Sequence, residues 1–216
     1  MTEATTIFVV DDDRSFLTAV TRWLRASGYP VQSFTSAAKF LEQYSSDVPG
    51  CLIADLQMAG LSGLDLQDTL IKADSPMPVI FLTGHGDIPT SVRAMRHGAV
   101  DFLTKRAPKE ELLDAVKRAL SRDVQTREQR ARLGGLRARF DTLTPREREV
   151  LAHVISGQLN KQIAHDLEIS ERTVKAHRGS IIDKLGLASV AELVRFAKEL
   201  DIAPAGSVSP ATVSKR

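Results

Sequence analysis

The 216-residue chain has 29 Lys+Arg and 27 Asp+Glu, and 43% of its residues are hydrophobic, which is the composition of a globular protein with at least one buried core. No apolar run approaches the ~20 residues of a membrane-spanning helix, and the first residues are too acidic for a signal peptide. The single cysteine, Cys51, excludes an internal disulfide. We therefore expect a cytoplasmic protein with no membrane partner.

The charge is distributed unevenly along the chain. Residues 1–122 carry 13 basic and 15 acidic side chains, whereas the remainder carries 16 basic and 12 acidic ones. The N-terminal part is mildly acidic and the C-terminal part is basic, which indicates different partners for the two.

Five short apolar runs divide the first half, at residues 7–10, 31–34, 51–54, 78–82 and 100–103. Four of them are dense in Val, Ile, Leu or Phe, as buried strands are, and segments with helical apolar spacing separate them. Strand alternating with helix predicts a parallel sheet with helices on both faces. The expected fold class is α/β, a doubly wound (βα)5 domain, with helix N-caps at Asp13, Ser36 and Ser62.

Polar side chains follow the predicted strands, at the edge of a doubly wound sheet where ligands bind. They are Asp11, Asp12 and Asp13 after the first run, Asp55 after the third, Thr83 after the fourth and Lys105 after the fifth. Gathered carboxylates suit Mg²⁺, a lysine and a hydroxyl can hold phosphoryl oxygens, and a carboxylate can accept a phosphoryl group. The pattern predicts Mg²⁺-dependent phosphorylation of an aspartate. Asp13 alone favours a helix N-cap over a metal ligand.

This first half resembles the receiver domains of two-component response regulators. The matching motifs are Asp11-Asp12 after two valines, Asp55 in IADLQM, Thr83 in FLTGHGD and Lys105 after VDFLT. The phrase LTGHGDIPTSVRAMRHGAVDFL is similar to the FixJ branch of that family.

The resemblance implies a role for each matching residue. Asp55 would be the phosphoacceptor. The implied Mg²⁺ ligands are Asp12, Asp55 and the backbone carbonyl of Gln57, with Asp11 acting through water. The residues implied to contact the phosphoryl oxygens are Lys105 and Thr83, and the aromatic implied to move on activation is Phe102.

Two positions depart from the family pattern. The segment Met58-Ala59 stands where many receivers have Met-Pro, and Lys105-Arg106 stands where many have Lys-Pro, often with a cis bond. A cis bond before a non-proline residue would cost about 2.5–4 kcal/mol. We therefore predict a trans bond, a rearranged loop after Lys105 and altered activation.

The second half divides into three segments. Residues 123–140 are rich in arginine and contain Gly134-Gly135, which indicates a linker that is helical in part. Residues 141–203 show only helical patterns and predict a small all-α domain. Residues 204–216 are rich in Ala, Ser and Pro and are expected to form a disordered tail.

The all-α segment contains a helix-turn-helix pattern. Thr144-Pro145 with Glu147 forms a capping box that starts a helix. A short helix, the turn 168–170 and a longer helix follow, as in DNA-binding proteins. The exposed face of the longer helix carries cations and small donors suited to phosphates and base edges, among them Arg172.

Residues 141–203 resemble the LuxR/NarL/FixJ output domain through LTPREREVL, NKQIA and SERTVKAHR. The resemblance implies that Lys175 and Ala176 face bases. The residues implied to lie nearer the DNA backbone are Lys161, Thr173, His177 and Arg178. The last helix, 190–200, is similar to that family's dimerisation helix, although its apolar stripe could equally pack inward.

The leading interpretation is a response regulator rather than an enzyme. A sensor histidine kinase would donate the phosphoryl group, and a homodimer formed on activation would bind double-stranded DNA and contact RNA polymerase. Phosphorylation would either expose a masked output domain or drive dimerisation, and the sequence leaves both open.

Two other interpretations compete with it. Asp11-x-Asp13 after an apolar strand is similar to the nucleophile motif of haloacid-dehalogenase-type phosphatases, but Arg14-Ser15 departs from that motif, and Gly86-Asp87 lacks the later aspartate. Alternatively, Ala59 and Arg106 could mark a receiver that acts as a dimerisation module without phosphorylation.

Overall fold

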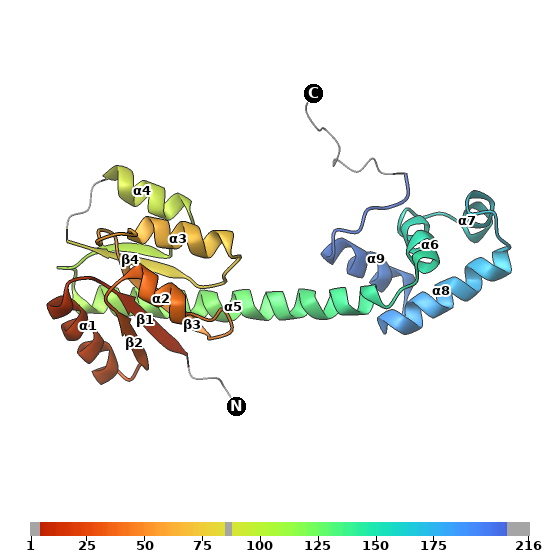
Figure 1. Ribbon diagram of the computed structural model, residues 1–216. Helices are drawn as coiled ribbons and strands as arrows, with labels where there is room; N and C mark the ends of the chain where they lie inside the picture. The colour runs from red at the N-terminus through yellow and green to blue at the C-terminus, as the bar shows by residue number, and fades with distance from the viewer. Residues whose placement is uncertain (1–4, 85–87, 207–216) are drawn as a thin grey trace, which may run out of the picture. The chain divides into compact units, whose positions relative to one another are not determined.

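The computed structural model describes residues 5–84 and 88–206, and the chain divides into two compact units, Met1–Glu128 and Gln129–Arg216 (Figure 1). The elements of the first unit are β1 (Thr6–Val10), α1 (Arg14–Ala26), β2 (Val31–Phe34), α2 (Ala37–Gln43), β3 (Gly50–Asp55), α3 (Gly63–Lys72), β4 (Val79–Thr83), α4 (Ile88–Arg96), β5 (Asp101–Thr104) and the start of α5 (Lys109–Asp141). Each of the five apolar runs forms a strand. The strands pair in parallel in the order β2-β1-β3-β4-β5, which confirms the doubly wound fold.

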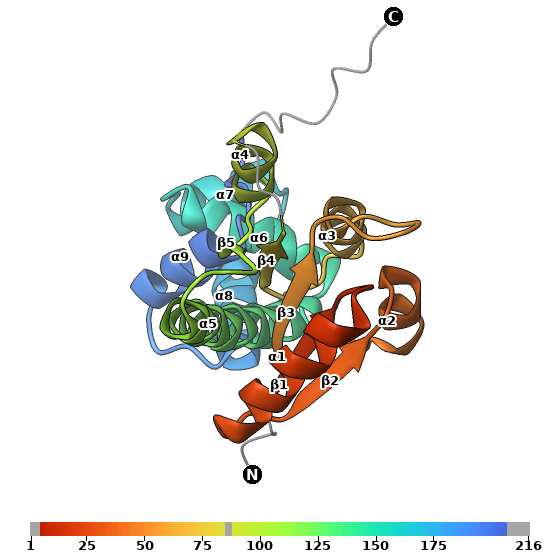
Figure 2. The ribbon, with the colours of Figure 1, turned by 90° about the vertical axis from the view of Figure 1, so that its left-hand side faces the viewer.

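The sheet is covered on both faces, and successive side chains of β1 enter different cores (Figure 2). Ile7 and Val9 pack with α1 and α5, whereas Phe8 and Val10 pack with α2, α3 and α4. A strand buried on both faces needs a continuous apolar run, which explains the density of the central runs. The two edge strands are less buried: the two middle residues of β2 are exposed, and β5 has three half-buried residues and one exposed residue.

The helix starts follow the caps expected from the sequence. Asp13 accepts hydrogen bonds from the backbone N–H groups of Ser15 and Phe16, and Ser36 and Ser62 cap α2 and α3 in the same way. The carboxylate of Asp13 therefore satisfies the first turn of α1, as predicted.

Helix α5 continues without interruption through the segment expected to be a linker. Asp123 in that segment is 1% exposed, accepts a hydrogen bond from Gly50 N–H at 2.8 Å and contacts Arg127 Nε at 2.9 Å. The guanidinium of Arg127 also donates to the carbonyls of Ser46 and Val48, at 2.8 and 2.9 Å. The first turns of the expected linker are thus packed into the first unit. A polar, arginine-rich sequence gives no apolar periodicity from which this packing could be read.

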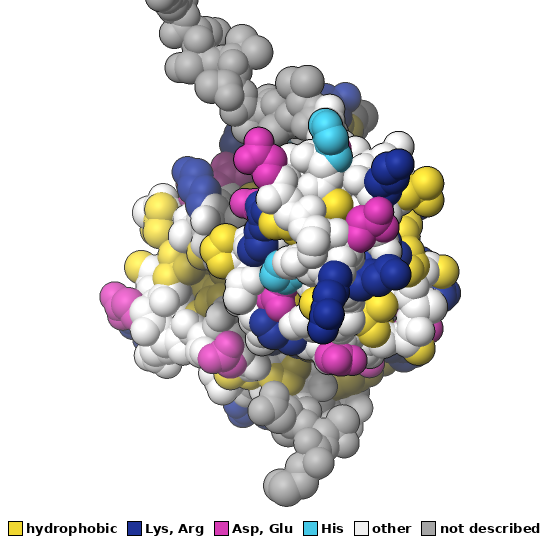
Figure 3. Space-filling model, turned by 90° about the vertical axis from the view of Figure 1, so that its right-hand side faces the viewer, with side chains coloured by type: hydrophobic (Ala, Val, Ile, Leu, Met, Phe, Trp, Pro, Cys, Tyr) yellow, Lys and Arg dark blue, Asp and Glu magenta, His cyan; other side chains and the backbone are white. Residues whose placement is uncertain are grey.

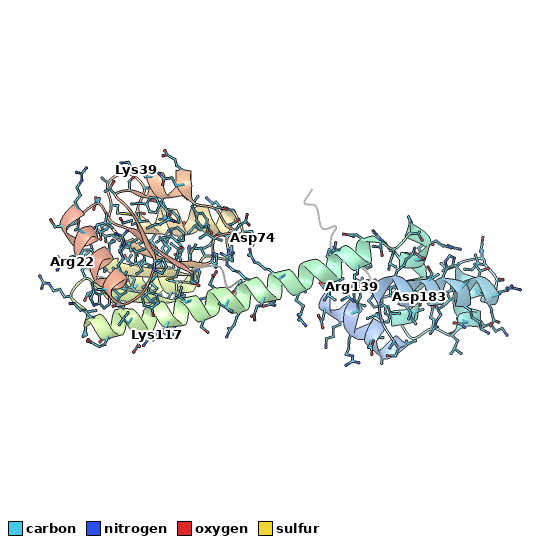
Figure 4. The ribbon with its side chains drawn as sticks, turned by 90° about the horizontal axis from the view of Figure 1, so that it is seen from below. Arg22, Lys39, Asp74, Lys117, Arg139 and Asp183 are labelled. Atoms are coloured by element: carbon cyan, nitrogen blue, oxygen red, sulfur yellow. The ribbon has the colours of Figure 1, made fainter. Side chains whose placement is uncertain are left out.

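The second unit is all-α, as predicted. Its helices after the end of α5 are α6 (Pro145–Ile155), α7 (Asn160–Asp166), α8 (Glu171–Leu185) and α9 (Val190–Glu199). Leu136 and Phe140 near the end of α5 pack against their core, and Arg139, labelled in Figure 4, donates to the carbonyl of Leu185 at 2.9 Å. Residues 207–216 of the expected tail lie outside the described residues. Within the described ranges, no helix is both long and apolar enough to traverse a bilayer.

Replacing Asp123 with alanine is expected to lower the free energy of unfolding of the first unit by about 3 kcal/mol, because the change leaves the partly buried Arg127 and the Gly50 N–H without their shared acceptor. Trp23 is the only tryptophan and lies in α1, so its fluorescence during urea unfolding reports on this unit. The exposed Glu128→Ala is the control and should shift stability by no more than about 0.5 kcal/mol. Equal stability of the two variants would show that the buried contacts contribute little.

Candidate functional site

The carboxyl ends of four parallel strands bring together the side chains that the sequence placed there. Asp11 follows β1, and Asp55 and Thr83 are the last residues of β3 and β4. In the sheet, Asp55 pairs with Leu82 in register. One carboxylate oxygen from each of Asp11, Asp12 and Asp55 lies within 4.8 Å of the other two.

Lys105, which follows β5, joins two of these carboxylates. Its Nζ lies 2.7 Å from Asp11 Oδ2 and 2.8 Å from Asp55 Oδ2, and the lysine side chain is only 16% exposed. The same ammonium stands 4.6 Å from the centre of the Phe16 ring, and the Lys105 backbone N–H donates to the Thr83 carbonyl at 2.8 Å. The lysine is therefore held at its backbone and at its charged end.

Burial and pairing compete in setting the charges of this cluster. Burial raises the pKa of Asp11, although the hydrogen bond from Lys105 opposes the effect. Burial alone would lower the pKa of Lys105, but its hydrogen bonds to Asp11 and Asp55 outweigh burial and raise it. Lys105 is thus a cation at neutral pH, and its ammonium contacts two of the three carboxyl groups, those of Asp11 and Asp55.

The other residues expected at this site lie around the cluster. Thr83 is fully buried, while Gln57 is exposed and its N–H donates to Asp55 Oδ1 at 3.3 Å. Phe102 is half-buried, with its ring centre 6.3 Å from that of Phe81. Nothing in these positions assigns a role to Gln57, Thr83 or Phe102, so the roles expected from the resemblance stay predictions.

The loop after Lys105 has the trans bond that the sequence predicts, since the described residues contain no cis peptide bond. Arg106 is exposed, and Ala107 N–H donates to the carbonyl of Thr104 at 2.9 Å, which closes a turn ahead of α5. The altered activation expected from this loop stays a prediction.

A contact at Ala59 was missed by sequence reasoning. The backbone N–H of Ala59 donates to Asp12 Oδ2 at 2.9 Å, across 47 residues of chain. The sequence feature that could have indicated this contact is the alanine at position 59, because a proline there would have no N–H to donate.

In the second unit, the residues expected at DNA lie on α7 and α8. Figure 3 looks onto the end of this unit that carries α7 and the start of α8, and Lys and Arg side chains gather there. The exposed members of the expected set are Lys161, Arg172, Lys175 and Ala176, and the half-buried members are Thr173, His177 and Arg178.

Two members of this set also maintain the local structure. The side chain of Arg178 donates to Asn160 Oδ1 at 2.9 Å and so joins α8 to the start of α7. The N–H of Thr173 donates to Ser170 Oγ at 3.1 Å, within the N-cap of α8. Lys175, by contrast, is exposed on α8 and lines a surface pocket together with Leu159 and Arg178.

The apolar stripe expected on the last helix is divided in the structure. Leu193 and Ala197 are 2% exposed and pack into the core with Phe196. Val190 and Val194 are 38% and 43% exposed. Half of the stripe therefore packs inward, and dimerisation through the exposed half stays a prediction.

Glu147 connects the two ends of the helix-turn-helix unit. Its buried carboxylate accepts hydrogen bonds from Ser180 at 2.6 Å, from Lys184 at 2.7 Å and from the backbone of Thr144 at 2.7 Å. Burial opposes its ionisation, but these hydrogen bonds outweigh burial and lower the pKa of Glu147 to about 2. The residue expected only as part of a capping box thus also holds α8 against α6.

Comparison with known proteins agrees with both halves of this description. Residues 7–117 match the response regulator receiver domain, and residues 141–197 match the bacterial regulatory proteins of the luxR family. The chain belongs to the family of two-component response regulators with a LuxR-type DNA-binding domain, and it is a phosphorylated regulator of transcription. The match to the receiver domain includes Asp11 and Asp13, which argues against the phosphatase interpretation. The other part of that motif, Gly86-Asp87, lies outside the described residues.

Relatives match over nearly the whole chain. Nodulation protein W of Bradyrhizobium diazoefficiens is 45% identical over 93% of this chain and 90% of its own length. Response regulator protein TodT of Pseudomonas putida is 43% identical over 91% and 87%, and transcriptional regulatory protein FixJ of Azorhizobium caulinodans is 39% identical over 97% and 100%. The solved structure of the response regulator StyR is 42% identical, covers 91% of this chain and 99% of its own, and superposes with a TM-score of 0.79.

Replacing Glu147 with glutamine is expected to lower the melting temperature of the second unit, most strongly at neutral pH. The pKa of Glu147 is depressed from 4.5 to about 2, so its stabilising contribution is fully present above pH 4.5 and is lost as the pH falls toward 2. Calorimetry of the full chain from pH 6 to pH 2 should show the difference between wild type and variant shrinking across this window. A difference that is constant with pH would contradict the role of the ionised carboxylate.

Proposed function

We propose that Asp55 is the residue that accepts the phosphoryl group, with a sensor histidine kinase as donor. The observation that carries this proposal is the position of its carboxylate, which lies 2.8 Å from Lys105 Nζ and close to the carboxylates of Asp11 and Asp12. An oxygen of Asp55 would attack phosphorus, the bond from phosphorus to the donor's histidine nitrogen would break, and that nitrogen would retain the bonding electrons. Lys105 and Thr83 would then hold the phosphoryl oxygens.

The carboxylate cluster fits Mg²⁺ as cofactor. All the proposed ligands are oxygens, from Asp12, Asp55 and the Gln57 carbonyl, with Asp11 acting through water, and such hard donors suit this ion. When bound, the ion would neutralise charge on the carboxylates and on the phosphoryl group. Asp11 also anchors Lys105, at 2.7 Å, and so would keep the ammonium in place when Asp55 is modified.

The second unit is proposed to bind double-stranded DNA with α8 in the major groove. Lys175 and Ala176 would face base edges, because both are exposed on the first turns of α8. The residues proposed to contact the sugar–phosphate backbone are Lys161, Arg172, Thr173, His177 and Arg178.

The active form is proposed to be a homodimer that contacts RNA polymerase. A single recognition helix covers too few base pairs for genomic specificity, so paired half-sites are expected. Val190 and Val194, exposed on one side of α9, offer an apolar surface for a second copy.

Incubation of the full chain with acetyl phosphate and Mg²⁺ should add one phosphoryl group to the wild type and none to Asp55→Asn, as measured by intact mass. Asp13→Asn is the matched control, because asparagine also caps helices and the variant should retain the adduct. An unlabelled wild type, under conditions that label another receiver, would favour a receiver that acts without phosphorylation.

Removal of a phosphate-contacting lysine should reduce the salt dependence of DNA binding. With a pool of random-sequence duplexes, Lys161→Ala is expected to reduce the slope of log affinity against log salt by about 0.9, the value for one released counterion. Lys117→Ala, an exposed lysine in the first unit paired with Asp114, should leave the slope unchanged. Equal slopes for all three proteins would remove Lys161 from the interface.

A further inference from the structure

Each carboxylate of the cluster accepts a hydrogen bond from one backbone N–H. Asp11 accepts from Asp13 at 2.9 Å, and Asp55 accepts from Gln57 at 3.3 Å, both from two residues further along the chain. Asp12 accepts from Ala59 at 2.9 Å, and this bond spans 47 residues to the loop between β3 and α3.

Asp12 depends on its backbone donor more than the other two carboxylates do. Asp11 and Asp55 are nearly buried and share Lys105, at 2.7 and 2.8 Å. Asp12 is exposed, and the hydrogen bond found for its side chain within the described residues is the one from Ala59. An exposed aspartate without a further anchor samples several rotamers, and ordering it for a metal ion costs conformational entropy.

We propose that the Ala59 N–H is a positioning group that orients the Asp12 carboxylate for Mg²⁺. It donates to Oδ2 of Asp12, and the carboxylate has a second oxygen that can bind the ion. Groups that hydrogen-bond a metal ligand from outside the coordination sphere commonly change metal affinity by about 10- to 100-fold. The inference rests on the proposed function in one respect, namely that Asp12 is a Mg²⁺ ligand.

The test measures metal affinity in the full chain without a phosphoryl donor. The concentration of free Mn²⁺ is measured by electron paramagnetic resonance, and Mg²⁺ is added as a competitor. Ala59→Pro removes the N–H, whereas Ala59→Ser is the matched control that keeps it. Ala59→Pro should weaken metal binding by about 10-fold and Ala59→Ser should match the wild type.

A double-mutant cycle with Asp12→Ala separates positioning from a general disturbance of the loop. If Ala59 acts through Asp12, Ala59→Pro has no further effect once Asp12 is alanine. An equal loss of affinity in both backgrounds would overturn the proposal, as would unchanged affinity of the single Ala59→Pro variant.

A variant without the proline ring guards against misfolding. Replacing Ala59 with lactic acid exchanges the N–H for an ester oxygen and keeps the methyl group, and Trp23 fluorescence checks that the first unit is folded. This ester should weaken metal binding as Ala59→Pro does, and wild-type affinity of the folded ester would overturn the proposal. A wild-type chain that binds neither ion would instead refute the metal site in the proposed function.

Discussion

The bridge from Lys105 to Asp11 and Asp55 is the interaction on which the first unit's site depends. The three residues lie at the carboxyl ends of three different strands, so an ammonium can reach both carboxylates only when β1, β3, β4 and β5 pair in one register. A one-residue slip of any strand would turn its side chains to the opposite face and separate the charges. Removing one partner of such a nearly buried pair is costly, because the other charge is left uncompensated. The contacts of Lys105 with the two carboxylates therefore depend on the correct pairing of the four strands.

Strands and strand ends were predictable from the sequence because they follow from short-range patterns. Continuous apolar runs belong to strands covered on both faces. In a parallel sheet the polar residues at the carboxyl ends of these strands lie at the same edge, so their proximity could be predicted without knowing any long-range contact. The contacts of Asp123 and of Ala59 were not predictable in this way. Each joins positions far apart in the chain, Asp123 to Gly50 and Ala59 to Asp12, and each uses a backbone N–H that every residue except proline possesses. Composition and periodicity carry no information about which of these donors is used.

Helix α9 in the second unit is another case in which the sequence pattern did not predict which side chains are buried. A period of 3.6 places Val190, Leu193, Val194 and Ala197 on a single stripe, but only part of this stripe is buried in the core of the unit. Leu193 and Ala197 complete the core, and the two valines are left exposed. The exposure of Arg172 and Lys175 on α8 was easier to predict, because burying an unpaired charge is costly.

Helix α5 belongs to both units, and the reasons for its helicity differ along its length. Leu112 is in a core of the first unit and Phe140 packs on the core of the second, so each end is held by tertiary contacts. Between them, Gly134 and Gly135 are helical although each costs about 1 kcal/mol relative to alanine. An added Cβ at either glycine would meet no neighbour among the described residues, so close packing does not explain their presence. The helical form of the glycine pair is therefore supported by the neighbouring turns of α5, which Arg127 and Arg139 hold through hydrogen bonds to backbone carbonyls.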